Sequence, residues 1–238
     1  MSNSFFRFKK FVIHQDKCVM KVCTDSCLFG AWVGDHLNKN ALDPSYILDA
    51  GSGTGLLSLM LAQKTSSQID AIEMEKNSFD QSHENIGASI FKERIQLYYG
   101  DMFTFQYPHK YDMIVCNPPF FIDHLKSVSV NKNNAMHNDT GNFKQIFTLA
   151  EDNLTKDGIL AIMVMYDDLE KIISWAGSKK LFPAKIATIQ HSPIHESFRA
   201  FILFEKKELE LVYENICIRN EVNEYTSVFQ YLLCDYYL

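Results

Sequence analysis

Short apolar runs alternate with longer segments of helical spacing over most of the chain. The apolar runs expected to form strands lie at 46–49, 69–73, 95–99, 111–116 and 158–165. Apolar residues recur at helical spacing over 55–64, 76–88, 143–154 and 167–178, which predicts helices there. Such alternation predicts an α/β fold with a mainly parallel sheet and helices on both of its faces.

The pattern changes near both ends of the chain. Runs at 184–190 and 199–206 have no helix between them, so they predict a hairpin, which makes one late strand antiparallel. Runs at 8–14 and 17–22 predict another hairpin, followed by a helix from 25 to about 37. Without an internal repeat or a linker, we expect one domain over 1–238. Residues 1–40 would form a hairpin-helix extension and 41–238 the core.

The 238 residues carry a net charge of −6, but residues 1–24 are locally basic. This basic arm could meet a polyanion or could be a solvated hairpin face, and the sequence leaves both open. With no cleavable signal and no apolar run as long as a membrane span, we expect a cytoplasmic protein that does not enter a membrane. The basic residues of the arm are Arg7, Lys9, Lys10, Lys17 and Lys21, against Asp16 alone.

Six cysteines lie mostly within apolar runs, which favours reduced core thiols over a disulfide framework. Cys18, Cys23 and Cys27 have the spacing C-x4-C-x3-C. That spacing lacks the C-x2-C pairs of zinc sites and a fourth ligand, so we expect no metal.

A glycine-rich segment joins the first strand of the alternating region to its first helix. Asp49 precedes Gly51, Gly53 and Gly55, and glycines at such a turn let backbone N–H groups approach a ligand. A dinucleotide fingerprint would require glycine at position 56, where this chain has Leu56, so the NAD pattern fails. A tight turn without a ligand is the alternative.

Carboxylates follow the next two strands. Glu73 ends the second strand, where it could accept both hydroxyls of a ribose, and Asp101 and Met102 follow the third. Taken singly, each carboxylate is more often an ordinary strand-end residue. Together with the glycine loop they predict a ligand site, because ligands bind at the carboxyl ends of parallel strands.

The segment Asn117-Pro118-Pro119-Phe120 follows the apolar run at 111–116. Two prolines fix φ and remove two donors, which leaves the Asn117 amide and the Pro118 carbonyl free to accept hydrogen bonds from an exocyclic amine. Phe120, with Phe121 beside it, could stack on the ring that carries the amine. The alternatives are a proline-stiffened turn and, for Phe121, an ordinary core position.

Seven strands with a terminal antiparallel hairpin and the Gly51-x-Gly53-x-Gly55 loop resemble the S-adenosylmethionine-dependent methyltransferases. The resemblance implies a Rossmann-like seven-stranded sheet and S-adenosylmethionine as cofactor. By this resemblance the loop packs on the methionine part, Asp49 helps hold its amino group, and Asp101 and Met102 contact the adenine. Asn-Pro-Pro-aromatic occurs in methyltransferases of adenine N6, guanine N2 and glutamine N5, so the tetrapeptide leaves the acceptor open.

The two ends of the chain resemble the bacterial tRNA1(Val) adenine-37 N6-methyltransferases. The resemblance implies an enzyme that methylates adenine 37 of tRNA, with Lys21, Thr24 and Asp25 near the cofactor. The alternatives for these three residues are a surface amine and a helix N-cap. The matching segments are 8–13, 16–22, Thr24-Asp25 with 28–32, Ile218-Arg219, Tyr225-Thr226 and 229–238.

One departure from that family lies in the polar loop at 122–142. Ala135 is followed by Met136 and His137, where the family tends to have an Ala-Arg pair, so an arginine contact to RNA is in doubt. The loop could be a substrate lid or a surface loop. Alternatives for the whole chain are a guanine-N2 methyltransferase of ribosomal RNA, a glutamine-N5 protein methyltransferase and a non-catalytic RNA-binding module. We favour a monomer.

Overall fold

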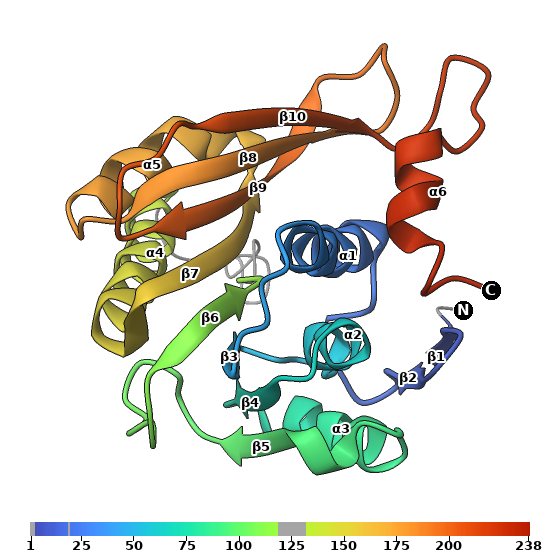
Figure 1. Ribbon diagram of the computed structural model, residues 1–238, viewed down its shortest axis with the longest axis vertical. Coiled ribbons are helices and arrows are strands. Elements are labelled where there is room, and N and C mark those ends of the chain that lie inside the picture. Colours follow the sequence, from blue (N-terminus) through green and yellow to red (C-terminus); the bar gives the residue numbers. More distant parts are fainter. Residues whose placement is uncertain (1–2, 19, 119–131) are drawn as a thin grey trace.

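The computed structural model describes residues 3–18, 20–118 and 132–238, and over 132–142 it describes the backbone alone. At its centre is a sheet of eight strands in the order β10-β8-β9-β7-β6-β3-β4-β5 (Figure 1). The strands are β3 (Tyr46–Ala50), β4 (Gln68–Glu73), β5 (Ile95–Tyr99), β6 (Tyr111–Cys116), β7 (Leu154–Met165), β8 (Phe182–Gln190), β9 (Ser197–Glu205) and β10 (Val212–Cys217). β9 runs antiparallel to both of its neighbours, and the other adjacent pairs are parallel.

The expected alternation and the antiparallel hairpin are confirmed, but the expected count of seven strands is wrong. β10 extends the sheet by pairing in parallel with β8. The sequence of β10, VYENIC, contains no continuous apolar run, and Ile216 is the one buried residue of this strand. An edge strand with so little buried surface carries no clear apolar signal.

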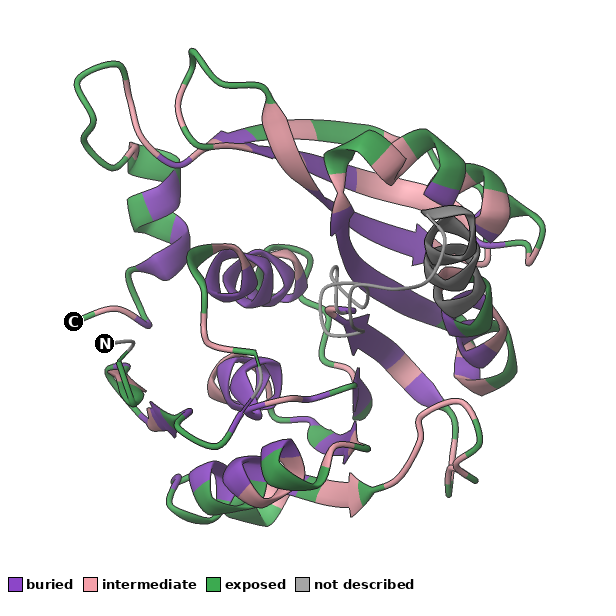
Figure 2. Cartoon of the chain, turned by 180° about the vertical axis from the view of Figure 1, so that it is seen from behind, coloured by how far each residue is buried: buried purple, intermediate pink, exposed green. Residues whose placement is uncertain are grey.

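Helices cover both faces of the sheet, and each face has its own hydrophobic core (Figures 1 and 2). Alternation within the strands divides them: Ile47 and Met113 belong to one core, whereas Leu48 and Ile114 belong to the other. On the first face lie α1 (Thr24–Lys39), α2 (Leu56–Lys64) and α3 (Lys76–Gly87); on the second lie α4 (Lys132–Asn153) and α5 (Leu169–Gly177). Two 3-10 turns are η1 (Lys92–Arg94) and η3 (Tyr166–Asp168), and α6 (Ser227–Leu233) packs against α1 and β10.

α4 begins at Lys132, whereas the sequence predicted a loop up to residue 142. Its first half is rich in asparagine and contains Gly141, and these residues have low helix propensity. The loop prediction is therefore wrong for 132–142. The remaining loop residues, 122–131, lie outside the described residues.

The N-terminal hairpin exists in a different register from the predicted one. β1 (Phe5–Arg7) pairs with β2 (Val12–His14), and the Phe8 N–H donates to the Phe11 carbonyl across the turn. The second predicted strand, 17–22, is wrong, because its described residues, 17–18 and 20–22, form no strand. The buried Gln15 holds the end of this segment, since its Oε1 accepts from the Val22 N–H at 2.7 Å. A side chain thus supplies the bond that a strand partner would have supplied.

Asn85 on α3 fastens this hairpin beside the glycine loop. Its Oδ1 accepts from the His14 N–H at 2.8 Å, and its Nδ2 donates to the His14 and Thr54 carbonyls at 2.9 Å each. Asn85 is 1% exposed, and its bond to the Thr54 carbonyl forms away from water. One buried amide therefore sets the position of the N-terminal segment relative to the carboxyl ends of the strands.

Cys18, Cys27 and Cys116 are buried, as expected of core thiols, but Cys23 and Cys234 are exposed, so the core prediction is wrong for these two. No helix in the described part of the chain has the length and apolar character needed to cross a membrane.

Candidate functional site

The loop after β3 requires glycine at three positions. Gly51, Gly53 and Gly55 have φ of 79°, 54° and 81°, a region that other residues enter at a cost. A β-carbon at Gly55 would also lie 2.7 Å from Ser82 Oγ, whereas one at Gly53 would meet nothing within 4 Å. The backbone at Gly53 is therefore open to a ligand.

Asp49 is a buried carboxylate with one unused oxygen. Oδ2 accepts from the Ser58 N–H at 2.9 Å and from the Ser58 hydroxyl at 2.6 Å, while the buried Oδ1 has no hydrogen-bond partner in the described part of the chain. Burial raises the pKa of Asp49 to about 6, although the Ser58 hydrogen bonds favour the charged form. A buried carboxylate oxygen without a partner favours a cationic group beside it.

Glu73 lies at the end of β4 and holds the glycine loop directly. Its Oε2 accepts from the Gly53 N–H at 2.9 Å, and its Oε1 accepts from the Glu75 N–H at 2.8 Å. Each carboxylate oxygen can accept a further hydrogen bond. The side chain predicted to bind ribose hydroxyls thus also orients the loop.

Asp101 and Met102 lie beside Glu73 and the glycine loop, because the Gly100 N–H donates to the Glu73 carbonyl at 3.0 Å. Asp101 Oδ1 accepts from the Phe103 N–H at 2.9 Å. A β-carbon on Gly51 would lie 3.9 Å from the sulfur of Met102, so the glycine loop and the segment after β5 are in contact range. The predicted strand-end residues come together at one edge of the sheet.

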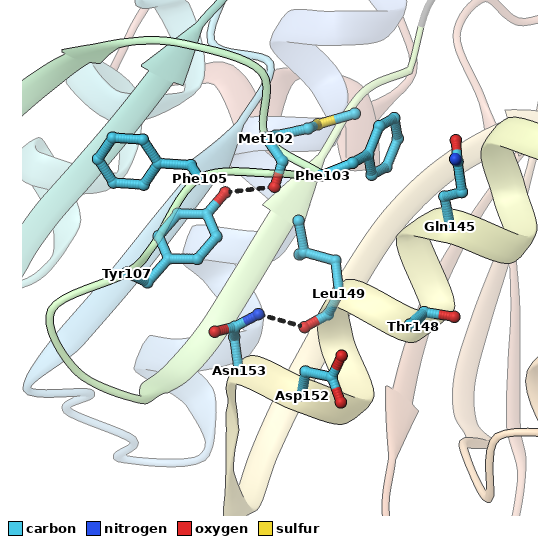
Figure 3. A pocket seen from close by; sticks show the side chains of 9 residues that line it. All are labelled: Met102, Phe103, Phe105, Tyr107, Gln145, Thr148, Leu149, Asp152 and Asn153. Carbon is cyan, nitrogen blue, oxygen red and sulfur yellow. Dashed lines mark hydrogen bonds between the residues drawn. The ribbon is translucent and has the colours of Figure 1, made fainter.

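A cavity of about 260 Å³ lies between the loop after β5 and α4 (Figure 3). Tyr107 donates from its hydroxyl to the Met102 carbonyl at 2.9 Å, so this carbonyl already has a partner. Aromatic rings of the loop lie across from Leu149 on α4. The rings give the region around Met102 an apolar wall.

Asn117 follows β6 and presents a second unused acceptor. Its Oδ1 is buried and has no hydrogen-bond partner among the described residues, and the following Pro118 is buried. Asn117, Gly51, Gly53 and Lys21 line one small cavity of about 70 Å³. The structure thus brings the predicted amine acceptor to the glycine loop.

The remaining residues of the predicted amine site, Pro119, Phe120 and Phe121, lie outside the described residues, as does the side chain of His137. The roles proposed for Pro119, Phe120 and Phe121 rest on the sequence, and His137 is assigned none.

The segment before α1 separates this cavity from a second pocket. Lys21 donates to the Gln15 carbonyl and faces the first cavity, whereas Thr24 and Asp25 line the second. Cys23 belongs to both walls. The N-cap of α1 is Cys23, whose N–H donates to Ser26 Oγ at 3.3 Å, so the N-cap alternative for Thr24 and Asp25 is wrong.

The sequence reasoning missed two residues of this region. Cys23 was read only as a thiol, although its place between Lys21 and Thr24 could have drawn attention to it. Asn85, which bonds the Thr54 carbonyl, gave no signal, because its partners are distant in the sequence. Among the described residues, no group of three or more His, Cys, Asp or Glu side chains is placed to hold a metal ion.

Comparisons with known proteins all find methyltransferases. The family model of the methyltransferase small domain matches residues 33–171. The tRNA1(Val) (adenine(37)-N6)-methyltransferase of Flavobacterium psychrophilum is 35% identical over 98% of this chain and 99% of its own length. The protein of the same name from Tolumonas auensis is 36% identical over 100% of this chain and 98% of its own.

A solved structure described as a predicted O-methyltransferase from Agrobacterium tumefaciens superposes with a TM-score of 0.69. The superposition covers 88% of this chain and 95% of the Agrobacterium chain, and the two sequences are 15% identical. At that identity the similarity shows the fold alone.

Proposed function

Because this chain belongs to the tRNA1(Val) (adenine(37)-N6)-methyltransferase family, we propose that it transfers a methyl group from S-adenosylmethionine to N6 of adenine 37 in tRNA1(Val). The observation that carries the proposal is the unpartnered, buried Oδ1 of Asn117 beside the glycine loop. An exocyclic amine would satisfy this oxygen. We take 1–238 as one methyltransferase domain that works in the bacterial cytoplasm, where tRNA is found.

The residues at the sheet edge fit S-adenosylmethionine, which supplies a methyl group on a positively charged sulfur. The unpartnered Oδ1 of Asp49 suits the amino group of its methionine part, and the open backbone at Gly53 lets that part approach closely. Glu73 would accept from the ribose hydroxyls, and Asp101 with Met102 would contact the adenine. Lys21 lies in the wall of the same cavity.

Adenine N6 is a weak nucleophile because its lone pair is delocalised into the ring. Hydrogen bonds to the Asn117 amide oxygen and the Pro118 carbonyl would hold the two N–H groups and favour a more tetrahedral nitrogen. Well-oriented reactants gain about 7–11 kcal/mol over free ones, so positioning alone supplies a large part of the catalysis. Stacking of the extruded adenine on Phe120, with Pro119 and Phe121 beside it, would add about 1–3 kcal/mol of binding.

Label transfer tests the proposal. The purified protein is incubated with S-adenosylmethionine labelled in its methyl group and with tRNA from a strain that lacks the corresponding gene. We expect N6-methyladenosine in the digested tRNA, and tRNA from the parent strain should accept little label. Label in N2-methylguanosine would favour the guanine alternative, and label in protein alone would refute the proposal.

A further inference from the structure

A second pocket of about 310 Å³ adjoins the methyl-transfer site. Three separate parts of the chain form it: the start of α1 with the residue before it, the β8–β9 loop with the start of β9, and the segment after β10. Both loops lie at the same end of the sheet (Figures 1 and 2). Cys23 forms a wall common to this pocket and the Asn117 cavity. The pocket is lined by Cys23, Thr24, Asp25, His191, Phe198, Ile218, Arg219 and Tyr225.

The pocket contains two flat surfaces that are already stacked. The His191 ring lies parallel to the Phe198 ring, with centroids 4.0 Å apart and an angle of 3° between the planes. The Arg219 guanidinium lies 4.2 Å from the centroid of Tyr225, and Tyr225 in turn stacks on the buried Phe229. Tyr225 is nevertheless 44% exposed, so an apolar ring at the site remains accessible to solvent.

Hydrogen bonds fix these groups in place. The backbone N–H of Arg219 donates to the His191 carbonyl at 2.9 Å, and this bond joins the two loops. Arg219 Nη1 also donates to the Asn223 carbonyl at 2.6 Å. The guanidinium keeps further donors for a ligand, since it carries five N–H groups. Little side-chain entropy is then lost when a planar ligand binds.

The charge of the pocket favours an anion. Asp25 Oδ2 accepts from Arg199 Nε at 3.0 Å, with both side chains 12% exposed, so a cation offsets the carboxylate. Arg219 adds a further positive charge to the lining. A ligand that combines a flat ring with a negative charge matches both properties, and a nucleotide is such a ligand.

We propose that this pocket takes a nucleotide next to the target adenine in the anticodon loop. The inference rests on the proposed function for the identity of the RNA. Extrusion of adenine 37 toward Asn117 unstacks its neighbours, and a base that has lost its stacking partner gains a new one on the His191 ring and on the Arg219 guanidinium that Tyr225 supports. Arg219 binds the adjoining phosphate. The common wall at Cys23 places this surface next to the extruded adenine.

The test uses anticodon stem-loop RNAs that carry 2-aminopurine on one side or the other of adenine 37, because its fluorescence falls on stacking. Wild type and Tyr225→Phe should quench the probe at one of the two positions. Tyr225→Ala should lose the quenching and bind the RNA about 10- to 100-fold more weakly. Its affinity for S-adenosylmethionine should stay within about twofold of wild type.

Two further variants guard against misfolding and non-specific effects. His191→Ala changes an exposed loop residue of the same pocket and should also weaken RNA binding. Tyr213→Ala removes a tyrosine that is 64% exposed on β10 outside the pocket, and it should behave as wild type.

RNA affinity and quenching that are unchanged in both Tyr225→Ala and His191→Ala would overturn the pocket assignment, even with methyl transfer intact. A wild type that quenches the probe but transfers no methyl to tRNA would support the pocket and refute the proposed function.

Discussion

Asp49→Asn tests whether the buried Asp49 carboxylate lacks a cationic partner that the cofactor would supply. Burial raises the pKa of Asp49 from 3.8 to about 6, which corresponds to about 3 kcal/mol against the charged form in the cofactor-free fold. Because the folded-state pKa is the higher one, the stabilising contribution is present below 3.8 and is lost as the pH rises through about 6. Between about pH 5 and pH 8 the loss is about 1.4 kcal/mol.

Urea unfolding of both proteins without cofactor, at about pH 5 and about pH 8, measures this difference. Wild type should lose about 1.4 kcal/mol relative to Asp49→Asn on going to the higher pH. The amide of the variant also changes the hydrogen bonds to Ser58, but that effect does not depend on pH and cancels in the comparison. Other titrating groups act on both proteins alike.

Cofactor binding should show the reverse dependence. If the amino group of S-adenosylmethionine pairs with Asp49, wild-type affinity rises up to about tenfold between about pH 5 and about pH 7, where the amino group stays protonated, and the affinity of Asp49→Asn stays flat. Calorimetric titration measures both. The reasoning would be refuted if the difference in unfolding free energy between wild type and Asp49→Asn were the same at both pH values. Equal pH dependence of cofactor binding in the two proteins would refute it as well.

Three further substitutions test the frame of the site. Gly55→Ala should lower the unfolding free energy by at least about 1–2 kcal/mol, because Gly55 has a φ of 81° and a β-carbon there would meet Ser82. The control Gly87→Ala, where a β-carbon would meet nothing within 4 Å, should cost no stability, and equal effects of the two variants in thermal melts would contradict this prediction. Asn85→Ala should lower the unfolding free energy by about 2–4 kcal/mol, since it leaves three backbone groups without their side-chain partner, and a neutral result in urea would show that the hairpin is held by other contacts. Glu73→Gln should weaken S-adenosylmethionine binding at least about tenfold through loss of charge-assisted hydrogen bonds, and an unchanged dissociation constant would exclude the ribose contact.

Features encoded by local pattern could be predicted from the sequence. Apolar runs located β3 to β9, because buried parallel strands need continuous apolar residues. The three glycines located the loop, because each occupies a backbone region that few other residues enter. Glu73 and Asp101 were predicted as site residues from their positions after strands, and the structure places both at the carboxyl ends of β4 and β5.

Features that depend on distant pairing were not predictable in this way. β10 is defined by its partner β8 and not by its own composition. The pairing of Asp25 with Arg199 joins residues far apart in the sequence. Asn85 could not be distinguished from an ordinary polar helix residue until the fold placed His14 and Thr54 against it. Local patterns therefore located the glycine loop and the strand ends beside it, and long-range packing created the adjoining pocket.

The most direct test of the central claim is the single-turnover rate of Asn117→Ala on tRNA1(Val), measured together with its affinities for S-adenosylmethionine and RNA. We expect a loss of at least about 100-fold in the methyl-transfer rate, on the order of the 2.7 kcal/mol that removal of one well-placed hydrogen-bonding group costs in other enzymes. The cofactor affinity should stay close to that of wild type. A methylation rate equal to that of wild type would contradict the role of Asn117 as the acceptor that holds adenine N6.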